Sequence, residues 1–262
     1  MRVALFATCV NDALYPSTAI ATVRLLERLG VEVDFPAEQT CCGQPQFNTG
    51  YRRETEPMVR RLARAFAAYE YVVTPSGSCT AMIRDAYPRI GARARTERRG
   101  TELAEAADSL VPRVYELTEF LIDVLEVEDV GAHFPYTVTY HPSCHGLRLL
   151  RLGDRPLRLL RAVRGLELVE LPGAEECCGF GGTFAVKNPD VSTAMGDDKV
   201  RNALGTGARV LCGGDNSCLL HLGGLLRRRS APLRPLHIAE ILASTEEQPW
   251  TGTSGDEQGS AV

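Results

Sequence analysis

The residues of this chain that are best suited to chemistry are its cysteines, and eight of the nine fall into a pattern that occurs twice. In each copy a single cysteine is followed by a Cys-Cys-Gly triplet and then by a last cysteine. The two sets are Cys9, Cys41, Cys42 and Cys79, and then Cys144, Cys177, Cys178 and Cys218. Thiolates gathered in this number typically hold a soft metal ion or an iron–sulfur cluster. The pattern therefore predicts two sites, each with four thiols.

Length, composition and charge exclude several other classes of protein. The chain has 262 residues, enough for one large domain or two smaller ones, and its hydrophobic fraction of 44% is that of an ordinary globular protein. A formal net charge of −4 gives no electrostatic reason to expect nucleic acid as a partner. No apolar run approaches the ~18 residues that a membrane-spanning helix needs. We expect no membrane span.

The cellular compartment follows from the start of the sequence and from the cysteines. The apolar start, residues 1–10, is short, and we interpret it as a buried strand rather than a signal peptide. A cytoplasmic location is therefore expected, where reduced thiols persist. The cysteine count is odd, and neighbouring cysteines such as Cys41 and Cys42 have poor geometry for a disulfide. Metal or redox chemistry is the better interpretation.

Hydrophobic periodicity predicts the same alternation of strands and helices in both halves of the chain. Strands are expected at 2–7, 31–35, 71–74, 137–141, 166–171 and 209–211, and helices at 17–29, 55–69, 79–87, 156–163, 191–204 and 217–226. Each half then closes with one more predicted helix, at 115–121 and 236–242. This order predicts an α/β fold of two similar halves related by a pseudo-twofold repeat, each a small parallel sheet with flanking helices.

The predicted domains are residues 1–130 and 131–244, each a cysteine-rich unit, followed by a disordered tail at 245–262. Residues 89–111 mix Arg and Glu and are expected to form a solvated helix or a mobile excursion.

Every cysteine of the two sets follows a predicted strand by a few residues. Because the carboxyl ends of parallel strands share one edge of a sheet, the eight thiols should converge there, four from each half. Gly43 and Gly179 are expected where the backbone passes close to a bulky ligand. Cys79 and Cys218 each begin a predicted helix, whose N-terminal dipole lowers the pKa of a thiol.

Other residues near the motifs have less definite roles. His141 and His145 flank Cys144 and are candidates for a proton relay, for substrate contacts, for additional metal ligands or for hydrogen-bonded support of a ligand. Cys212 lies outside the repeat and is expected to pack in the core. The sequence identifies no catalytic residue beyond the two histidines.

Four segments in order, residues 39–45, 75–79, 141–145 and 177–184, together resemble a known family. The chain is similar to the lactate utilization protein A family, within the cysteine-rich CCG-domain proteins. That superfamily also contains the cysteine-rich subunits of heterodisulfide reductase and of anaerobic glycerol-3-phosphate dehydrogenase. The resemblance covers residues 2–242, which is nearly the whole chain.

The resemblance implies an iron–sulfur redox subunit, of 4Fe–4S or another cluster type, in a cytoplasmic system that oxidises L-lactate to pyruvate. It implies an iron–sulfur partner protein, a third subunit and a small 2-hydroxy acid as substrate. The superfamily motif ends in Cys-x-x-Cys, but here Ser76 and Asp215 stand in place of the first of these cysteines. Each site therefore has four thiols as cofactor and metal ligands, with Ser76 or Asp215 as candidate oxygen ligands.

Two alternatives stay open at this stage. Four thiolates bind zinc well, so a structural zinc protein is one. Thiol redox chemistry without a metal, like that of heterodisulfide reductase, is the other.

Overall fold

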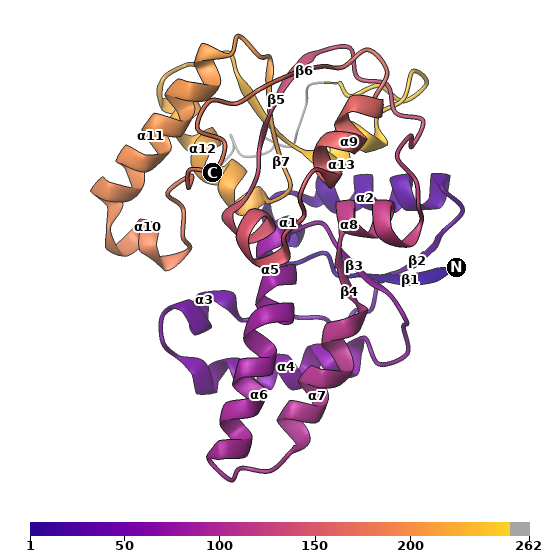
Figure 1. Ribbon diagram of the computed structural model, residues 1–262, viewed down its shortest axis with the longest axis vertical. Helices are drawn as coiled ribbons and strands as arrows, with labels where there is room; N and C mark the ends of the chain where they lie inside the picture. Colours follow the sequence, from indigo (N-terminus) through magenta and orange to yellow (C-terminus); the bar gives the residue numbers. More distant parts are fainter. Residues whose placement is uncertain (252–262) are drawn as a thin grey trace, which may run out of the picture.

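The computed structural model describes residues 1–251 and contains two sheets of four parallel strands, one in each half of the chain (Figure 1). Their strand orders are β2-β1-β3-β4 and β6-β5-β7-β8. The strands of the first sheet are β1 (Arg2–Leu5), β2 (Glu32–Asp34), β3 (Val72–Thr74) and β4 (Val114–Glu116). Those of the second are β5 (Thr137–His141), β6 (Glu167–Val169), β7 (Val210–Gly213) and β8 (Arg234–His237). The predicted fold class is confirmed.

Helices connect these strands. In the first half they are α1 (Cys9–Leu14), α2 (Pro16–Arg28), α3 (Gln44–Asn48), α4 (Arg52–Ala65), α5 (Gly77–Ala81), α6 (Tyr87–Thr96), α7 (Glu102–Leu110) and α8 (Leu117–Glu119). In the second half they are α9 (Arg155–Ala162), α10 (Thr183–Lys187), α11 (Pro189–Gly205), α12 (Asn216–Arg228) and α13 (Ile238–Ala243). Short π-helical turns occupy Met82–Ala86, Phe120–Val124 and His145–Leu150, and a 3-10 turn occupies Val111–Arg113. The predicted helices and strands lie within a few residues of these positions. Two strands of the structure were not predicted.

Those two are the outer strands β4 and β8, where the sequence predicted that a closing helix had already begun. Each strand pairs with a central neighbour, β4 with β3 and β8 with β7. The helices α8 and α13 begin only at the next residue, capped by the side chains of Glu116 and His237. Short apolar runs fit either element. The pairing partner that decides between them is distant in the chain, since Val114 pairs with Val72 and Arg234 pairs with Val210. Local periodicity could not supply that partner.

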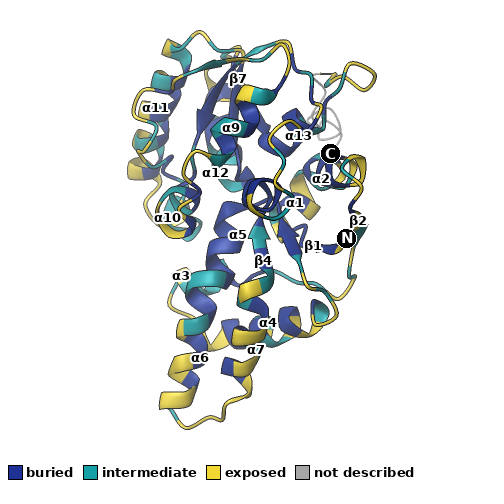
Figure 2. Ribbon diagram, turned by 45° about the vertical axis from the view of Figure 1, so that its right-hand side comes forward, coloured by how far each residue is buried: buried dark blue, intermediate teal, exposed yellow. Residues whose placement is uncertain are grey.

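Residues 89–111 form a packed helical hairpin rather than a mobile excursion. Helices α6 and α7 lie side by side at the lower end of the molecule (Figure 1). The inner face of α7 is buried, while the outer faces of both helices are exposed (Figure 2). A Cβ atom on Gly91 would stand 2.7 Å from the Cα atom of Ala104, so glycine allows the two helices to approach closely.

The two halves share a hydrophobic core. One cluster joins Leu25 and Val73 of the first half to Val138 and Ile238 of the second. Polar contacts add to it: Thr18 Oγ1 donates to Glu240 Oε1 at 3.0 Å. The sheets therefore cannot shift relative to one another without exposing apolar surface.

The tail predicted to be disordered starts inside the described region. Trp250 packs its ring against Phe134, with ring centroids 5.4 Å apart, and against Tyr136 at 5.7 Å. Residues 252–262 lie outside the described residues. Within residues 1–251, no helix has both the length and the apolar character needed to cross a membrane.

Candidate functional site

The eight cysteines of the two sets line a single cavity of about 340 Å³. They reach it from loops that follow the central strands β1, β3, β5 and β7 and the outer strands β2 and β6. None of the described cysteines forms a disulfide. The short helices after the two Cys-Cys-Gly loops, α3 and α10, also line the cavity. They approach each other where Thr49 Oγ1 and Thr183 Oγ1 are 3.4 Å apart. Two groups of four thiols thus face one shared space.

In the first site the thiols form two close pairs. The Sγ atoms of Cys9 and Cys41 are 3.6 Å apart, and those of Cys42 and Cys79 are 3.4 Å apart. The backbone N–H of Gly43 donates to Cys41 Sγ at 3.4 Å. Cys42 and Cys79 are buried, whereas Cys9 lies at the exposed rim.

The second site repeats this arrangement. Interaction with Cys177 raises the pKa of Cys144, and interactions with Cys177 and then Cys218 raise the pKa of Cys178, so the same pairs lie close together. The N–H of Gly179 donates to Cys177 Sγ at 3.4 Å, as Gly43 does to Cys41. Cys178 is buried and the other three are partly exposed.

Electrostatics single out the first cysteine of each vicinal pair. Hydrogen bonds from Cys42, then from Cys9, hold the pKa of Cys41 well below its ordinary value. Hydrogen bonds from Cys144, then from Cys178, do the same to the pKa of Cys177. Each quartet therefore carries its first negative charge at the cysteine that the following glycine N–H also contacts. Thiolate is the form that binds a metal.

Cys79 and Cys218 lie in the first turns of α5 and α12, as the sequence predicted. Ser76 and Asp215 are the N-cap residues of these helices: Ser76 Oγ accepts from Cys79 N at 3.3 Å, and Asp215 Oδ1 from Ser217 N at 3.1 Å. Asp215 also crosses to the other half, where its Oδ2 accepts from Ser78 N at 2.7 Å. Both residues line the cavity. Their observed hydrogen bonds give them a structural role, and their part as oxygen ligands stays a prediction.

Gly43 and Gly179 are required by the helices that pack against their loops. Both have positive φ, 83° and 89°. A Cβ on Gly43 would stand 2.6 Å from Thr55 Cγ2 of α4, and one on Gly179 would stand 2.4 Å from the carbonyl oxygen of Ser192 in α11. The sequence analysis did not identify these helix neighbours, and a close approach of the two glycines to a bound ligand stays a prediction.

His141 and His145 both reach the sites, in different ways. The ring of His145 lines the cavity, and its Nε2 lies 3.1 Å from Gln44 Nε2 of the other half. His141 ends β5 and is 1% exposed. One of its ring nitrogens and the Sγ atoms of Cys178 and Cys218 all lie within 4.8 Å of one another. Burial, and next the charge of Lys199, lower the pKa of His141 to about 4, so the imidazole is neutral near pH 7.

Several residues that the sequence did not single out also build the site. Asn11 Nδ2 donates to the carbonyl of Pro75 at 3.0 Å, and Asn216 Nδ2 donates to Asn11 Oδ1 at 2.9 Å, which ties the loops of the two halves together.

Lys199 is fully buried and donates to the carbonyl oxygens of Gly173 and Ala174. The sequence offered one signal for Lys199, which is a lysine inside the predicted helix 191–204. Cys212 is buried in the shared core, which confirms its predicted packing role.

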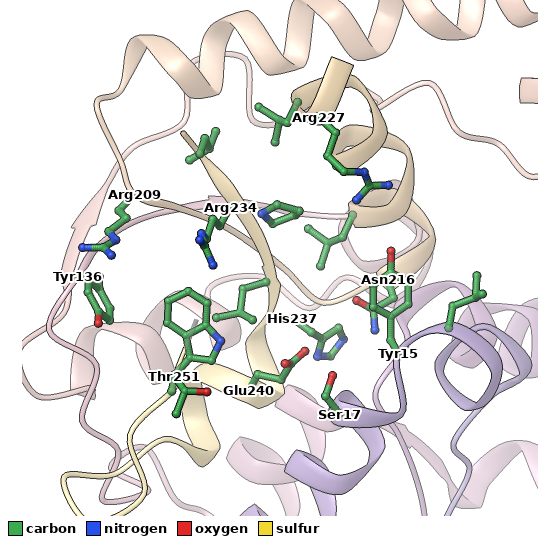
Figure 3. A pocket seen from close by; sticks show the side chains of 18 of the residues that line it. Tyr15, Ser17, Tyr136, Arg209, Asn216, Arg227, Arg234, His237, Glu240 and Thr251 are labelled. Atoms are coloured by element: carbon green, nitrogen blue, oxygen red, sulfur yellow. The ribbon is translucent and has the colours of Figure 1, made fainter. Parts of the chain in front are cut away.

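A larger cavity, of about 540 Å³, lies beside β8 and contains no cysteine. Arg209, Arg227, Arg234 and His237 are among the side chains around it (Figure 3). Asn216 lines both cavities. Size alone would favour this cavity as a functional site, but the smaller one holds the eight clustered thiols.

The residues around the smaller cavity fit a metal or iron–sulfur cofactor. They offer free thiols, of which two carry lowered pKa values. Beside Cys178 and Cys218 lies the buried His141, without a hydrogen-bond partner on either ring nitrogen among the described residues. Soft sulfur donors select zinc, copper or iron–sulfur centres.

Comparison with known proteins agrees with this geometry. The model of the family described as the cysteine-rich CCG domain matches residues 3–84 and 138–223. The chain belongs to this class, with one CCG domain in each half. Lactate utilization protein A from Geobacillus thermodenitrificans is 50% identical over 92% of this chain and 98% of its own length. The protein of the same name from Exiguobacterium is 51% identical over 92% of this chain and 96% of its own. The chain therefore belongs to the lactate utilization protein A family.

A solved structure supports the fold alone. A hypothetical protein from Helicobacter pylori superposes with a TM-score of 0.60 and 12% identity, over 92% of this chain and 48% of that chain.

Proposed function

We propose that this chain is the iron–sulfur redox subunit of a cytoplasmic system that oxidises L-lactate to pyruvate. The observation that carries the proposal is the convergence of eight thiols on one cavity, in two quartets and without disulfides. The names of the relatives, lactate utilization protein A, indicate lactate as the substrate. These relatives are about 50% identical to this chain over nearly its full length. The quartets are Cys9, Cys41, Cys42 and Cys79, and Cys144, Cys177, Cys178 and Cys218.

Oxidation of lactate to pyruvate releases two electrons and two protons. An iron–sulfur centre, when bound, supplies one-electron redox chemistry. The residues of this chain hold such centres and control their surroundings. Phe180, Pro45 and Val186 help to line the cavity and make it largely apolar, which limits solvent at the sulfurs and tunes the reduction potential.

We propose that the isolated chain does not turn over lactate. Among the described cavity residues, no general base is paired with a substrate-binding cation, so the proton transfers are expected to need other subunits. The partners proposed are an iron–sulfur protein and a third subunit of the same system. Lactate-dependent dye reduction by the isolated chain would contradict this part of the proposal.

Anaerobic purification tests the cofactor. Wild-type protein should be brown and contain iron and acid-labile sulfide, and Cys178→Ser should lose a large part of both. Cys212→Ala is the matched control, since Cys212 is buried in the core away from the cavity. Colourless protein with stoichiometric zinc would replace the redox proposal with a structural zinc site. Metal-free protein whose thiol count falls on mild oxidation would replace it with thiol–disulfide chemistry.

A further inference from the structure

The least explained polar group in the described chain is the imidazole of His141. Its residue is 1% exposed, and neither ring nitrogen has a hydrogen-bond partner among the described residues. Buried polar groups are nearly always paired, and an unpaired one calls for a specific explanation such as an ion. His237, also buried, differs in one respect: its Nδ1 accepts from Ala239 N at 3.1 Å, and only its Nε2 has no partner among the described residues.

The position of His141 supplies the explanation. Among the described residues, His141, Cys178 and Cys218 form the one group of histidine, cysteine or acidic side chains whose ligand atoms all lie within 4.8 Å of one another. An ion placed among three such atoms would be at bonding distance from each after small adjustments, since metal–nitrogen and metal–sulfur bonds measure about 2.0–2.3 Å. A histidine that merely supported a ligand would hydrogen-bond through one nitrogen, which His141 does not do.

We propose that the imidazole of His141 is a direct nitrogen ligand of the centre in the second site, alongside its thiolates. The inference deepens the proposed function and rests on the second site holding a metal centre. It divides the two sites chemically: one of sulfur ligands, the other of sulfur and nitrogen.

The first half shows that this ligand is not part of the shared scaffold. Phe6 stands three residues before Cys9, as His141 stands three residues before Cys144. Phe6 is fully buried and packs its ring on Phe66, with centroids 5.6 Å apart. A phenyl ring cannot ligate a metal, so the first site has no nitrogen donor at this position.

A second buried difference between the two sites lies on the helix that packs against each Cys-Cys-Gly loop. Met58 and Met195 contact the equivalent glycines Gly43 and Gly179, and one turn further along each helix stand Leu62 and Lys199. Both are fully buried. The buried ammonium of Lys199 makes the second site less negative, so its centre should be reduced at a more positive potential than the first.

The test uses the full chain, purified anaerobically, with His141→Phe, which copies the first site, and His237→Gln as a control at another buried histidine. Metal per chain should fall towards half in His141→Phe and stay unchanged in His237→Gln. His141→Cys should restore the metal content, because a thiolate can take the place of the imidazole. Full metal content in a folded His141→Phe protein overturns the inference.

Nitrogen hyperfine coupling measured by pulsed electron paramagnetic resonance separates ligation from packing. Wild type and His237→Gln should show imidazole coupling, whereas His141→Cys should have metal without it. Iron-containing wild type without that coupling, in both oxidised and reduced forms, overturns the inference and leaves the proposed function intact. Wild type without iron and sulfide instead contradicts the proposed function, and the metal count of His141→Phe still decides whether His141 is a ligand.

Discussion

The two halves of this molecule place their sulfur atoms alike but surround them differently. Both have a four-stranded parallel sheet, a Cys-Cys-Gly loop and a cysteine in the first turn of a helix. At the end of the first strand, however, one half has Phe6 and the other His141. On the helix behind the loop, one has Leu62 and the other Lys199, all of them buried. The shared scaffold sets where the thiols lie, and single buried residues set which other donor and which charge lie beside them.

The halves also differ away from the site. The first carries the hairpin of α6 and α7, while α12 of the second passes to β8 through a short turn. The hairpin lies at the far end of the molecule from the second half (Figure 1). The differences at the site therefore arise from residue type rather than from added elements.

The largest expected effect comes from removing one centre at a time. Cys42→Ser should lose the first centre and Cys178→Ser the second, each with about half of the metal. Redox titration of the surviving centres should then give a more positive potential in Cys42→Ser, which retains His141 and Lys199. Equal potentials in the two variants would show that the buried differences do not affect the centres.

The two loop glycines should differ in their tolerance of a methyl group. Gly179→Ala places Cβ against a backbone oxygen at 2.4 Å, whereas Gly43→Ala meets side-chain atoms at 2.6 and 2.9 Å that can move. We expect losses of about 3 and about 2 kcal/mol in the free energy of unfolding. Gly207→Ala is the control, with φ 70° and no atom within 4 Å of the new Cβ, and should lose about 1 kcal/mol. Denaturant unfolding measures all three, and equal losses would refute the comparison.

Opposite pH dependence is expected from the residues that end the outer strands. Burial raises the pKa of Glu116 to about 7 and lowers the pKa of His237 to about 4. Each is therefore favoured in its neutral form when the chain is folded. The stability contribution of Glu116 is complete below its ordinary pKa of 4.5 and is lost as the pH rises to 7. That of His237 is complete above 6.5 and is lost as the pH falls to 4.

Thermal unfolding as a function of pH checks this prediction. Glu116→Gln should be more stable than wild type at pH 8, by on the order of 2 kcal/mol, and close to it at pH 5. His237→Gln should lose less stability than wild type between pH 6.5 and 4. Parallel pH profiles for wild type and Glu116→Gln would show that Glu116 is ionised in the folded chain at neutral pH.

The smallest expected effect is the difference in stability lost when each of the two helix caps is removed. Asp215→Ala removes the cap of α12 and the contact with Ser78 N across the halves, and should cost about 2 kcal/mol. Ser76→Ala removes one cap bond and should cost about 1 kcal/mol. Metal content is measured beside stability. Loss of metal in either variant, with the fold retained, would assign that residue as an oxygen ligand as well as a cap.

Much of the fold followed from local pattern. The strand at 137–141 was predicted with the bounds it has in β5, because it is rich in β-branched and aromatic residues and follows Pro135. β4 and β8 were missed because their pairing partners, and not their own residues, make them strands. Residues 89–111 were predicted as a solvated helix or a mobile excursion, and the packing of α6 on α7 was missed because the buried stripe of α7, with Leu103 and Leu110, lies among many charged residues.

By itself, the sequence determined which atoms can bind a cofactor and that they come in two equivalent sets. The order of strands and helices also determined the edge of each sheet where the thiols lie, since parallel strands end on the same side. Only the tertiary structure decided that both sets face one cavity, that Asp215 accepts a hydrogen bond from Ser78 N of the other half, and that His141 lies unpaired beside Cys178 and Cys218. These contacts join residues far apart in the chain, and their geometry depends on how the two sheets pack on their shared core, which no local pattern encodes.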